Sequence, residues 1–457
     1  MENKPQHSEA RFFEEMSTAA MLENSAPVAG LLAEGMALAM NEELDGALEF
    51  FVKASVEQPT SFYAWFCRGY AELSLMMHEE AEVSFLRAKE LDPKNISTRY
   101  WLAHTHFLRD FVEEAVGELK EIIAEAPDFV EAYYDCGVGF QIMGRYDDAL
   151  EIFRRRIVIS PDFDTYLMMA MTYEYQKNLE KAADFYARAL ELEPDNIMVI
   201  EAHGATCLEL GRLEEAMSDF QFALEIDPES PDALYGRGHT FFRMEKIQEA
   251  KRDLLRVVEL DPDSALAWSM LGQLALYDED FSLAIRLLKK ALEVDEDILV
   301  SGFLGQAHMG MEDYEEAVRY FILALEFEPE EADYYAQRGV ALFFLKRFEE
   351  AIRDFNAAEE KDSGWDDFSL RGIAHSELLN FESAVKDISR GIQLSPENVD
   401  LYLYRAEAFC SLEKTAEAQK DIQTVMSLAE KAKDEKLAEQ CGKFLKEIQR
   451  MEGEVNG

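Results

Sequence analysis

Residues 231–264 read PDALYGRGHTFFRMEKIQEAKRDLLRVVELDPDS. Apolar and small residues recur at helical spacing in each half, at Leu234, Gly238 and Phe241 and then at Ala250, Leu254 and Val257. Pro231 stands where a helix can begin, because its missing N–H costs nothing in the first turn, and Pro262 closes the stretch. The stretch therefore predicts two antiparallel helices joined by a short turn.

The pattern of this stretch recurs along most of the chain. One alanine of the second predicted helix returns at steps of 34 residues, which shorten to 33 three times. These alanines are Ala47, Ala81, Ala115, Ala149, Ala182, Ala216, Ala250, Ala284, Ala317, Ala351, Ala384 and Ala418. The corresponding repeats start near residues 28, 62, 96, 130, 163, 197, 231, 265, 298, 332, 365 and 399. Because each copy can bury its apolar face only against its neighbours, the period predicts an all-α solenoid.

Every repeat carries a small residue at its eighth position, and glycine fills it nine times. The residues are Gly35, Gly69, Ala103, Gly137, Ala170, Gly204, Gly238, Gly272, Gly305, Gly339, Gly372 and Ala406. Glycine inside a helix costs about 0.5–1 kcal/mol relative to alanine. Its recurrence predicts that the paired helix approaches the first helix closely at this point.

Together these positions resemble the tetratricopeptide repeat, which also has an aromatic residue at position 24 and a proline at position 32. Residues 332–364 show the pattern at Tyr335, Gly339, Leu342, Ala351, Phe355 and Ala358, and residues 28–61 end it with Phe51, Ala54 and Pro59. The resemblance covers residues 28–432. It implies a right-handed superhelical solenoid of antiparallel helix pairs, whose first helices line a concave groove that binds peptides or proteins.

The segments outside the twelve repeats are short. We expect residues 1–27 to form an N-terminal helix or cap, and residues 433–457 to form a C-terminal capping helix and a short tail. The second expectation rests on an apolar stripe at helical spacing, made by Leu437, Cys441, Phe444, Leu445 and Ile448. So little sequence lies outside the repeats that we expect no appended catalytic domain.

Charge and composition narrow the possible partners. The chain has 92 acidic and 45 basic residues and a formal net charge of −47, which opposes binding to nucleic acid and anionic membranes. The acidity reflects either repeated solvated faces or a preference for basic partners. No stretch is long and apolar enough for membrane insertion, and the five scattered cysteines show no disulfide or zinc spacing. We expect a cytoplasmic protein without cofactors or metals.

Catalytic motifs are missing from the sequence, so we expect no enzyme. His104 and His106 lie two residues apart and would point to different sides of a helix, which disfavours a shared metal. A second set of histidines falls on packing or groove positions and is expected to be structural: His203, His239, His308 and His375.

The residues expected to line the groove are apolar and aromatic. Positions 5 and 9 lack the lysines and asparagines with which chaperone-binding members of the family clamp a carboxylate. The predicted protein-binding residues are Tyr63, Phe66, Tyr70, Tyr100, Trp101, Phe107, Tyr134, Met168, Met171 and Tyr175. A large apolar surface favours binding, although packing between adjacent first helices is the alternative for each residue. We predict an interaction scaffold for an apolar segment with basic flanks, or alternatively a holding chaperone for secreted or membrane-associated clients.

Two departures from the repeat pattern and one recurring arginine position yield further expectations. The turns at 295–297 and 362–364 lack proline and are one residue shorter than in most repeats. They are either ordinary turn variants or hinges. Arg156 occupies a position usually held by alanine and should either point outward or pair with an acid of the next repeat, and we expect such an ion pair rather than a phosphate site. We expect the arginines at position 7 to pair with acids of a neighbouring repeat; they are Arg68, Arg237, Arg338 and Arg371.

Overall fold

The computed structural model describes residues 28–296, 299–362 and 368–455, and all regular secondary structure in these ranges is helical. The predicted N-terminal cap, residues 1–27, lies outside the described residues, as do parts of the turns at 295–297 and 362–364. The chain divides into two compact units, residues 1–228 and 229–457, which we call unit 1 and unit 2. The division falls at the boundary between two repeats.

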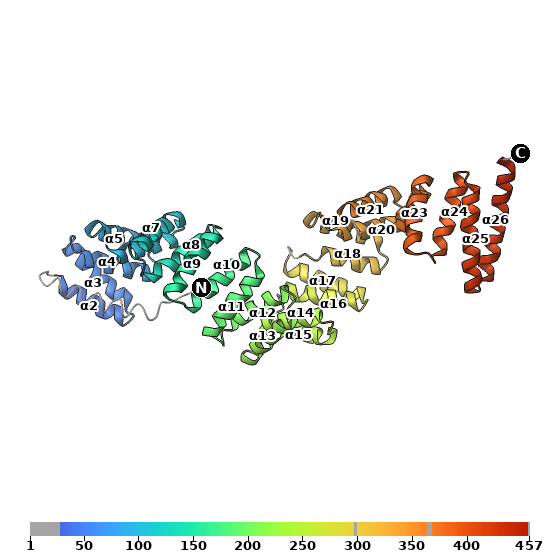
Figure 1. Cartoon of the computed structure of the whole chain (residues 1–457). Coiled ribbons are helices and arrows are strands. Elements are labelled where there is room, and N and C mark those ends of the chain that lie inside the picture. Colours follow the sequence, from blue (N-terminus) through green and yellow to red (C-terminus); the bar gives the residue numbers. More distant parts are fainter. Residues whose placement is uncertain (1–27, 297–298, 363–367, 456–457) are drawn as a thin grey trace. The chain divides into compact units, whose positions relative to one another are not determined.

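Unit 1 consists of consecutive helices in which each first helix packs against the second helix that follows it (Figure 1). Its helices are α2 (Ala29–Met40), α3 (Leu44–Glu57), α4 (Phe62–Ser74), α5 (His78–Leu91), α6 (Ile96–Leu108), α7 (Val112–Glu125), α8 (Val130–Ile142), α9 (Tyr146–Ile159), α10 (Phe163–Tyr175), α11 (Leu179–Leu192), α12 (Ile197–Glu209) and α13 (Leu213–Ile226).

Unit 2 repeats the same arrangement. Its helices are α14 (Pro231–Arg243), α15 (Ile247–Leu260), α16 (Ala265–Tyr277), α17 (Phe281–Val294), α18 (Ser301–Gly310), α19 (Tyr314–Phe327), α20 (Ala332–Phe344), α21 (Phe348–Lys361), α22 (Phe368–Glu377), α23 (Phe381–Leu394), α24 (Val399–Ser411), α25 (Thr415–Ala432) and α26 (Glu435–Val455). The last helix buries Cys441 and Ile448 in a cluster with residues of α24 and α25.

Close packing within each pair explains the small residues of the repeat. A Cβ atom added to Gly137 would lie 2.3 Å from the ring of Phe153, and one added to Gly339 would lie 2.8 Å from the ring of Phe355. The twelve periodic alanines are all fully buried, with 0% of their surface exposed. The predicted close approach of the paired helices is therefore confirmed.

The turn inside each pair has a fixed geometry. In the repeat that begins with α4, Met76 adopts the left-handed conformation with φ of 62°, and the Met77 N–H donates to the Glu72 carbonyl over 2.8 Å. This pattern ends a helix and satisfies carbonyls of its last turn. Equivalent positions elsewhere are mostly occupied by residues other than glycine, as at Leu379, whereas Gly144 and Gly211 fill this position in unit 1.

Contacts between pairs show on which side each unit curves. Along unit 1, α2 contacts α4, α4 contacts α6, α6 contacts α8 and α8 contacts α10. No two second helices within the described part of the chain make contacts of comparable extent. The first helices therefore lie on the shorter, inner side of the curve, and each unit has the all-α superhelical repeat fold that the sequence predicts.

Arginine at position 7 pairs mainly within its own repeat, so the prediction of a partner in a neighbouring repeat is wrong for most of these residues. Arg338 Nε donates to Asp354 Oδ2 over 2.7 Å, across the pair formed by α20 and α21. Arg237 reaches Asp253 in the same way. Positions 7 and 23 face each other beside the glycine contact, which brings the two charges of one repeat together. Arg371 contacts both its own Asp387 and Glu359 of the preceding repeat.

None of the described helices is both long enough and apolar enough to cross a membrane.

Candidate functional site

One side of each first helix is turned away from the second helix of its pair. Positions 2, 5, 6, 9, 12 and 13 fall on this side, because successive residues of a helix turn by about 100°. We call the partly or fully exposed residues at these positions of α4, α6, α8 and α10 the inner face of unit 1. Its apolar and histidine members are Tyr63, Trp101, His104, Phe107, Leu108, Tyr134, Val138, Ile142, Leu167, Met168, Met171 and Tyr175.

Three of the predicted groove residues are buried and do not belong to this surface. Phe66, Tyr70 and Tyr100 expose only 1%, 3% and 8% of their surface. Their rings pack against neighbouring aromatic residues: the ring centroids of Phe66 and Phe85 lie 5.8 Å apart, and those of Tyr70 and Trp101 lie 4.9 Å apart. Phe85 belongs to α5, the second helix of the same pair, and Trp101 belongs to the next first helix, α6, so both kinds of neighbour cover these side chains. The prediction that these three residues line a groove is therefore wrong.

The other predicted residues retain exposed surface. Tyr63, Trp101, Phe107, Tyr134, Met168 and Met171 are partly exposed. Tyr175 is 56% exposed, and its ring stacks on that of Tyr146 with the centroids 5.6 Å apart.

Sequence reasoning missed the neighbouring apolar residues at position 13. Leu108 and Ile142 expose 48% and 61% of their surface, and they occupy the same position as Tyr175 in successive repeats. The recurrence of large apolar residues at position 13 was the signal that could have found them.

Carboxylates lie among these apolar side chains. Asp135 Oδ2 is 2.9 Å from His104 Nδ1, between α8 and α6. Burial raises the pKa of Tyr100 well above its usual range, and the negative charge of Asp135 raises it further. Burial also raises the pKa of Tyr134, to which the charges of Asp164 and Asp135 contribute. The inner face thus combines apolar surface with negative charge.

Polar contacts fix the helices that carry this face. Gln141 Nε2 on α8 donates to Thr172 Oγ1 on α10 over 2.6 Å and to the Met168 carbonyl over 3.2 Å. Arg156 Nη1 lies 2.9 Å from Asp162 Oδ1, and its guanidinium lies over the Tyr134 ring. Arg156 therefore forms an ion pair, but its partner is the last residue of its own repeat and not an acid of the next repeat.

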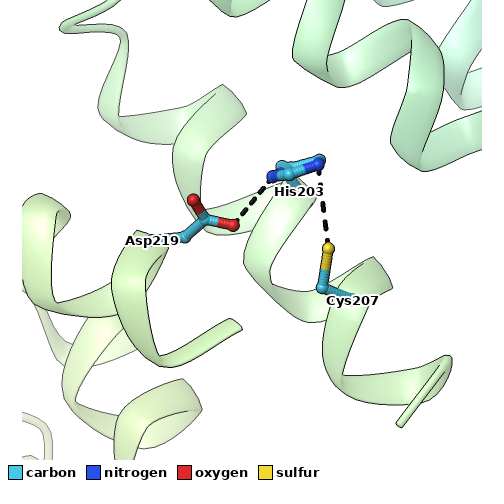
Figure 2. Close-up of side chains that lie close together, drawn as sticks. All are labelled: His203, Cys207 and Asp219. Carbon is cyan, nitrogen blue, oxygen red and sulfur yellow. Dashed lines mark hydrogen bonds and ion pairs between the residues drawn. The ribbon is translucent and has the colours of Figure 1, made fainter. Parts of the chain in front are cut away.

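A second cluster lies in the last pair of unit 1 (Figure 2). His203 and Cys207 lie one turn apart on α12, and Asp219 faces them from α13. His203 Nδ1 is 2.7 Å from Asp219 Oδ2, and its Nε2 is 3.7 Å from Cys207 Sγ. Burial lowers the pKa of His203, but hydrogen bonds to Asp219 and Cys207 outweigh it and raise the pKa to about 10.

Sequence reasoning missed this cluster. The spacing of a histidine and a cysteine four residues apart on one predicted helix was the available signal. The position of Asp219 opposite them depends on how α12 and α13 pack.

Comparison with protein families finds the same repeat in several parts of the chain. Tetratricopeptide repeat models match residues 163–196, 208–274, 265–298 and 304–365. The matches lie in both units.

Curated relatives are distant and longer than the matched region. The chain is 24% identical over 235 residues to the BBSome complex member BBS4 of Bos taurus, across 51% of this chain and 45% of that protein. It is 26% identical over 148 residues to anaphase-promoting complex subunit 3 of Schizosaccharomyces pombe, across 30% of this chain and 22% of that protein. The matched region therefore spans less than half the length of these relatives.

Solved structures with similar helix arrangements include the APC/C hetero-tetramer Cut9–Hcn1. That match has 14% sequence identity and a TM-score of 0.40, and it covers 94% of this chain and 98% of the other. YrrB, described as a TPR protein with an unusual peptide-binding site, matches with 23% identity and a TM-score of 0.37, over 40% of this chain and 95% of the other. The repeat matches and the array of helix pairs identify this chain as a tetratricopeptide repeat protein with many tandem repeats.

Proposed function

We propose that this protein is an interaction scaffold and that the inner face of unit 1 binds an apolar segment of another protein with basic flanking residues. The observation that carries the proposal is the row of exposed apolar residues at position 13, from Leu108 through Ile142 to Tyr175. Exposed apolar side chains in register along successive helices are favoured sites of protein binding, because covering them removes apolar surface from water.

The expected charge of the partner follows from the acids on and beside this face. Glu131 and Asp164 are exposed at position 2 of α8 and α10, and Asp135 lies between α6 and α8. The chain as a whole carries a net charge of −47. Lysine or arginine beside the apolar segment would accelerate association and select against acidic partners.

The named relatives support a role in assemblies. Two of them are called members or subunits of multiprotein complexes, the BBSome and the anaphase-promoting complex. We transfer only the general property of contacting other proteins. A non-enzymatic role and a cytoplasmic location stay predictions from the sequence.

Methionines on the inner face favour a second possibility. Met168 and Met171 are partly exposed on α10. Methionine adapts its shape to different apolar surfaces, so this part of the face could accept several unrelated segments. A holding chaperone for secreted or membrane-associated clients would use it in that way.

A peptide panel tests the proposal. Three labelled helical peptides of equal length would be titrated with the full chain by fluorescence anisotropy: leucine–lysine, leucine–glutamate and serine–lysine. We expect the leucine–lysine peptide to bind at least roughly tenfold more tightly than either other peptide, because only it offers both apolar area and opposite charge.

Equal affinity for the leucine–lysine and serine–lysine peptides would show that charge alone drives binding and would contradict the proposal. Peptides with unrelated apolar sequences and lysine flanks distinguish a dedicated scaffold from a holding chaperone. Similar affinities for all of them favour the chaperone, and a preference for one sequence favours a dedicated scaffold.

A further inference from the structure

The cluster formed by His203, Cys207 and Asp219 combines three side chains that ligate transition metals. One ligand atom from each residue lies within 4.8 Å of the other two. Cys207 is fully buried, whereas His203 and Asp219 expose 14% and 20% of their side chains. Figure 2 shows the imidazole ring between the carboxylate and the sulfur.

Comparison with other repeats shows that this composition is a departure from their pattern. His203 and Asp219 occupy positions 7 and 23, which hold an arginine–aspartate pair in four repeats of unit 2. Position 11, which Cys207 occupies, carries an aromatic residue, leucine or histidine beside those four pairs: Phe241, Leu342, His375 and Phe409. The repeat that starts at residue 197 therefore has an imidazole where these four repeats have arginine, and a thiol beside it.

We propose that His203, Cys207 and Asp219 bind a thiophilic divalent cation, with Zn²⁺ as the expected ion. Zinc accepts histidine nitrogen, cysteine sulfur and carboxylate oxygen, at distances of about 2.0–2.3 Å. The imidazole now presents Nδ1 to Asp219 and Nε2 to Cys207, so binding requires the ring to turn until one nitrogen faces the cation together with the carboxylate and the sulfur. A thiolate and a carboxylate together would neutralise the charge of the cation.

Three protein ligands leave a fourth position for water or a group from a partner. The partial exposure of His203 and Asp219 places that position toward solvent, and the buried sulfur closes the other side. The cation would join α12 to α13 and so hold together the last helix pair of unit 1. This inference is independent of the proposed peptide binding, and it opposes the expectation of no metal drawn from the sequence.

The alternative is that His203 merely replaces arginine in the repeat's ion pair and that Cys207 only fills the core. The variant His203→Arg separates the two interpretations. It restores the pair seen in other repeats, so the helix pair should still fold, but it removes the imidazole ligand.

The test uses the full chain, first treated with a chelator and then titrated with Zn²⁺ in excess Ca²⁺ and Mg²⁺, which occupy the many surface carboxylates. Isothermal titration calorimetry should show one tight site in the wild-type protein, and Zn²⁺ should raise its melting temperature. His203→Arg should keep wild-type helicity and lose more than roughly 100-fold in affinity, as should Cys207→Ser.

Replacing Zn²⁺ with Co²⁺ gives a readout that does not depend on how well the variants fold. Sulfur ligation produces a thiolate-to-cobalt charge-transfer band in the wild-type protein. Absence of a tight site in the wild-type protein, absence of that band, or equal affinity in His203→Arg would each overturn the proposal.

Discussion

The two units build the same helix pair, but their repeats fill the facing positions 7 and 23 in different ways, and arginine–aspartate pairs stand there only in unit 2. In unit 2, four repeats place arginine opposite aspartate at positions 7 and 23: Arg237 and Asp253, Arg338 and Asp354, Arg371 and Asp387, and Arg405 and Asp421. Two repeats of unit 1 hold Cys136 and Ile152, or Met169 and Phe185, at these positions in one apolar cluster, and a third holds His203 and Asp219. The periodic alanines are fully buried in both units.

This difference shows which contacts specify the fold. The contact between positions 8 and 24 and the buried alanine at position 20 recur in both units, whereas the neighbouring pair changes from ionic to apolar. Replacing a buried ion pair with apolar residues of similar size is often neutral, although removing one partner is strongly destabilising. We therefore expect that replacing both residues of the ion pair preserves stability, whereas replacing only one of them lowers it.

The largest effect is expected from breaking one pair in unit 2. Asp354→Ala leaves the half-buried Arg338 without its carboxylate and should lower the free energy of unfolding by about 3 kcal/mol. The double variant Arg338→Met with Asp354→Leu imitates the apolar positions of unit 1 and should recover most of the loss. Urea denaturation followed by circular dichroism measures both. A double variant as unstable as Asp354→Ala would show that the ionic pair itself is required.

A smaller loss is expected where a glycine permits close packing in unit 1. Gly137→Ala places a methyl group 2.3 Å from the Phe153 ring and should cost about 1–3 kcal/mol of unfolding free energy. Gly117→Ala on α7 is the matched control, because no atom lies within 4 Å of the new methyl group. That control should stabilise the protein by about 0.5–1 kcal/mol through helix propensity. Equal effects at the two positions would refute the packing explanation.

The turn between paired helices offers a stabilising change of similar size. Leu379 in unit 2 has φ of 58° and is 72% exposed, whereas Gly144 and Gly211 occupy this turn position in unit 1. Leu379→Gly should raise the free energy of unfolding by about 1 kcal/mol, because glycine adopts the left-handed conformation without steric cost. Gly211→Ala should lower it by a similar amount. Thermal melts of both variants check the opposite signs.

The smallest effect is expected from transferring the unit 2 pair into unit 1. His203→Arg recreates the arginine–aspartate pair with Asp219 and should change the metal-free stability by less than about 1 kcal/mol, since the charges and the register are retained. Chemical denaturation in the presence of a chelator measures this. A loss of several kcal/mol would show that the local packing around α12 and α13 does not accept the guanidinium group.

Much of the fold could be predicted because the repeated residues indicate where the paired helices pack against each other. The twelve alanines and the glycine positions mark the places where paired helices touch, and a 34-residue period carries that information many times. The sequence led us to expect that Arg338 pairs with an acid of a neighbouring repeat, whereas it pairs with Asp354 of its own repeat. Its position could be read from the period, but the direction of a long side chain depends on which acid the folded pair brings within reach.

The binding surface was predicted less well. Phe66, Tyr70 and Tyr100 were assigned to it because their positions fall on one side of the helix, yet packing against neighbouring helices, as of Phe66 on Phe85 and of Tyr70 on Trp101, buries them. Residue type cannot show this burial, since aromatic side chains suit both a core and an interface. Ile142 at position 13 remains exposed because it lies at the end of its helix.

The most direct test of the account compares two triple variants for binding of the leucine–lysine peptide. One replaces exposed apolar residues of the inner face, Leu108→Ser, Ile142→Ser and Tyr175→Ser. The matched control replaces exposed apolar residues of second helices, Val83→Ser, Val158→Ser and Leu192→Ser. All six side chains are largely exposed, so both proteins should keep wild-type helicity.

The account predicts that the inner-face variant binds the peptide at least roughly tenfold more weakly than the wild-type protein and that the control binds like the wild-type protein. Wild-type affinity in the inner-face variant, or an equal loss in the control, would contradict the assignment of binding to the first helices.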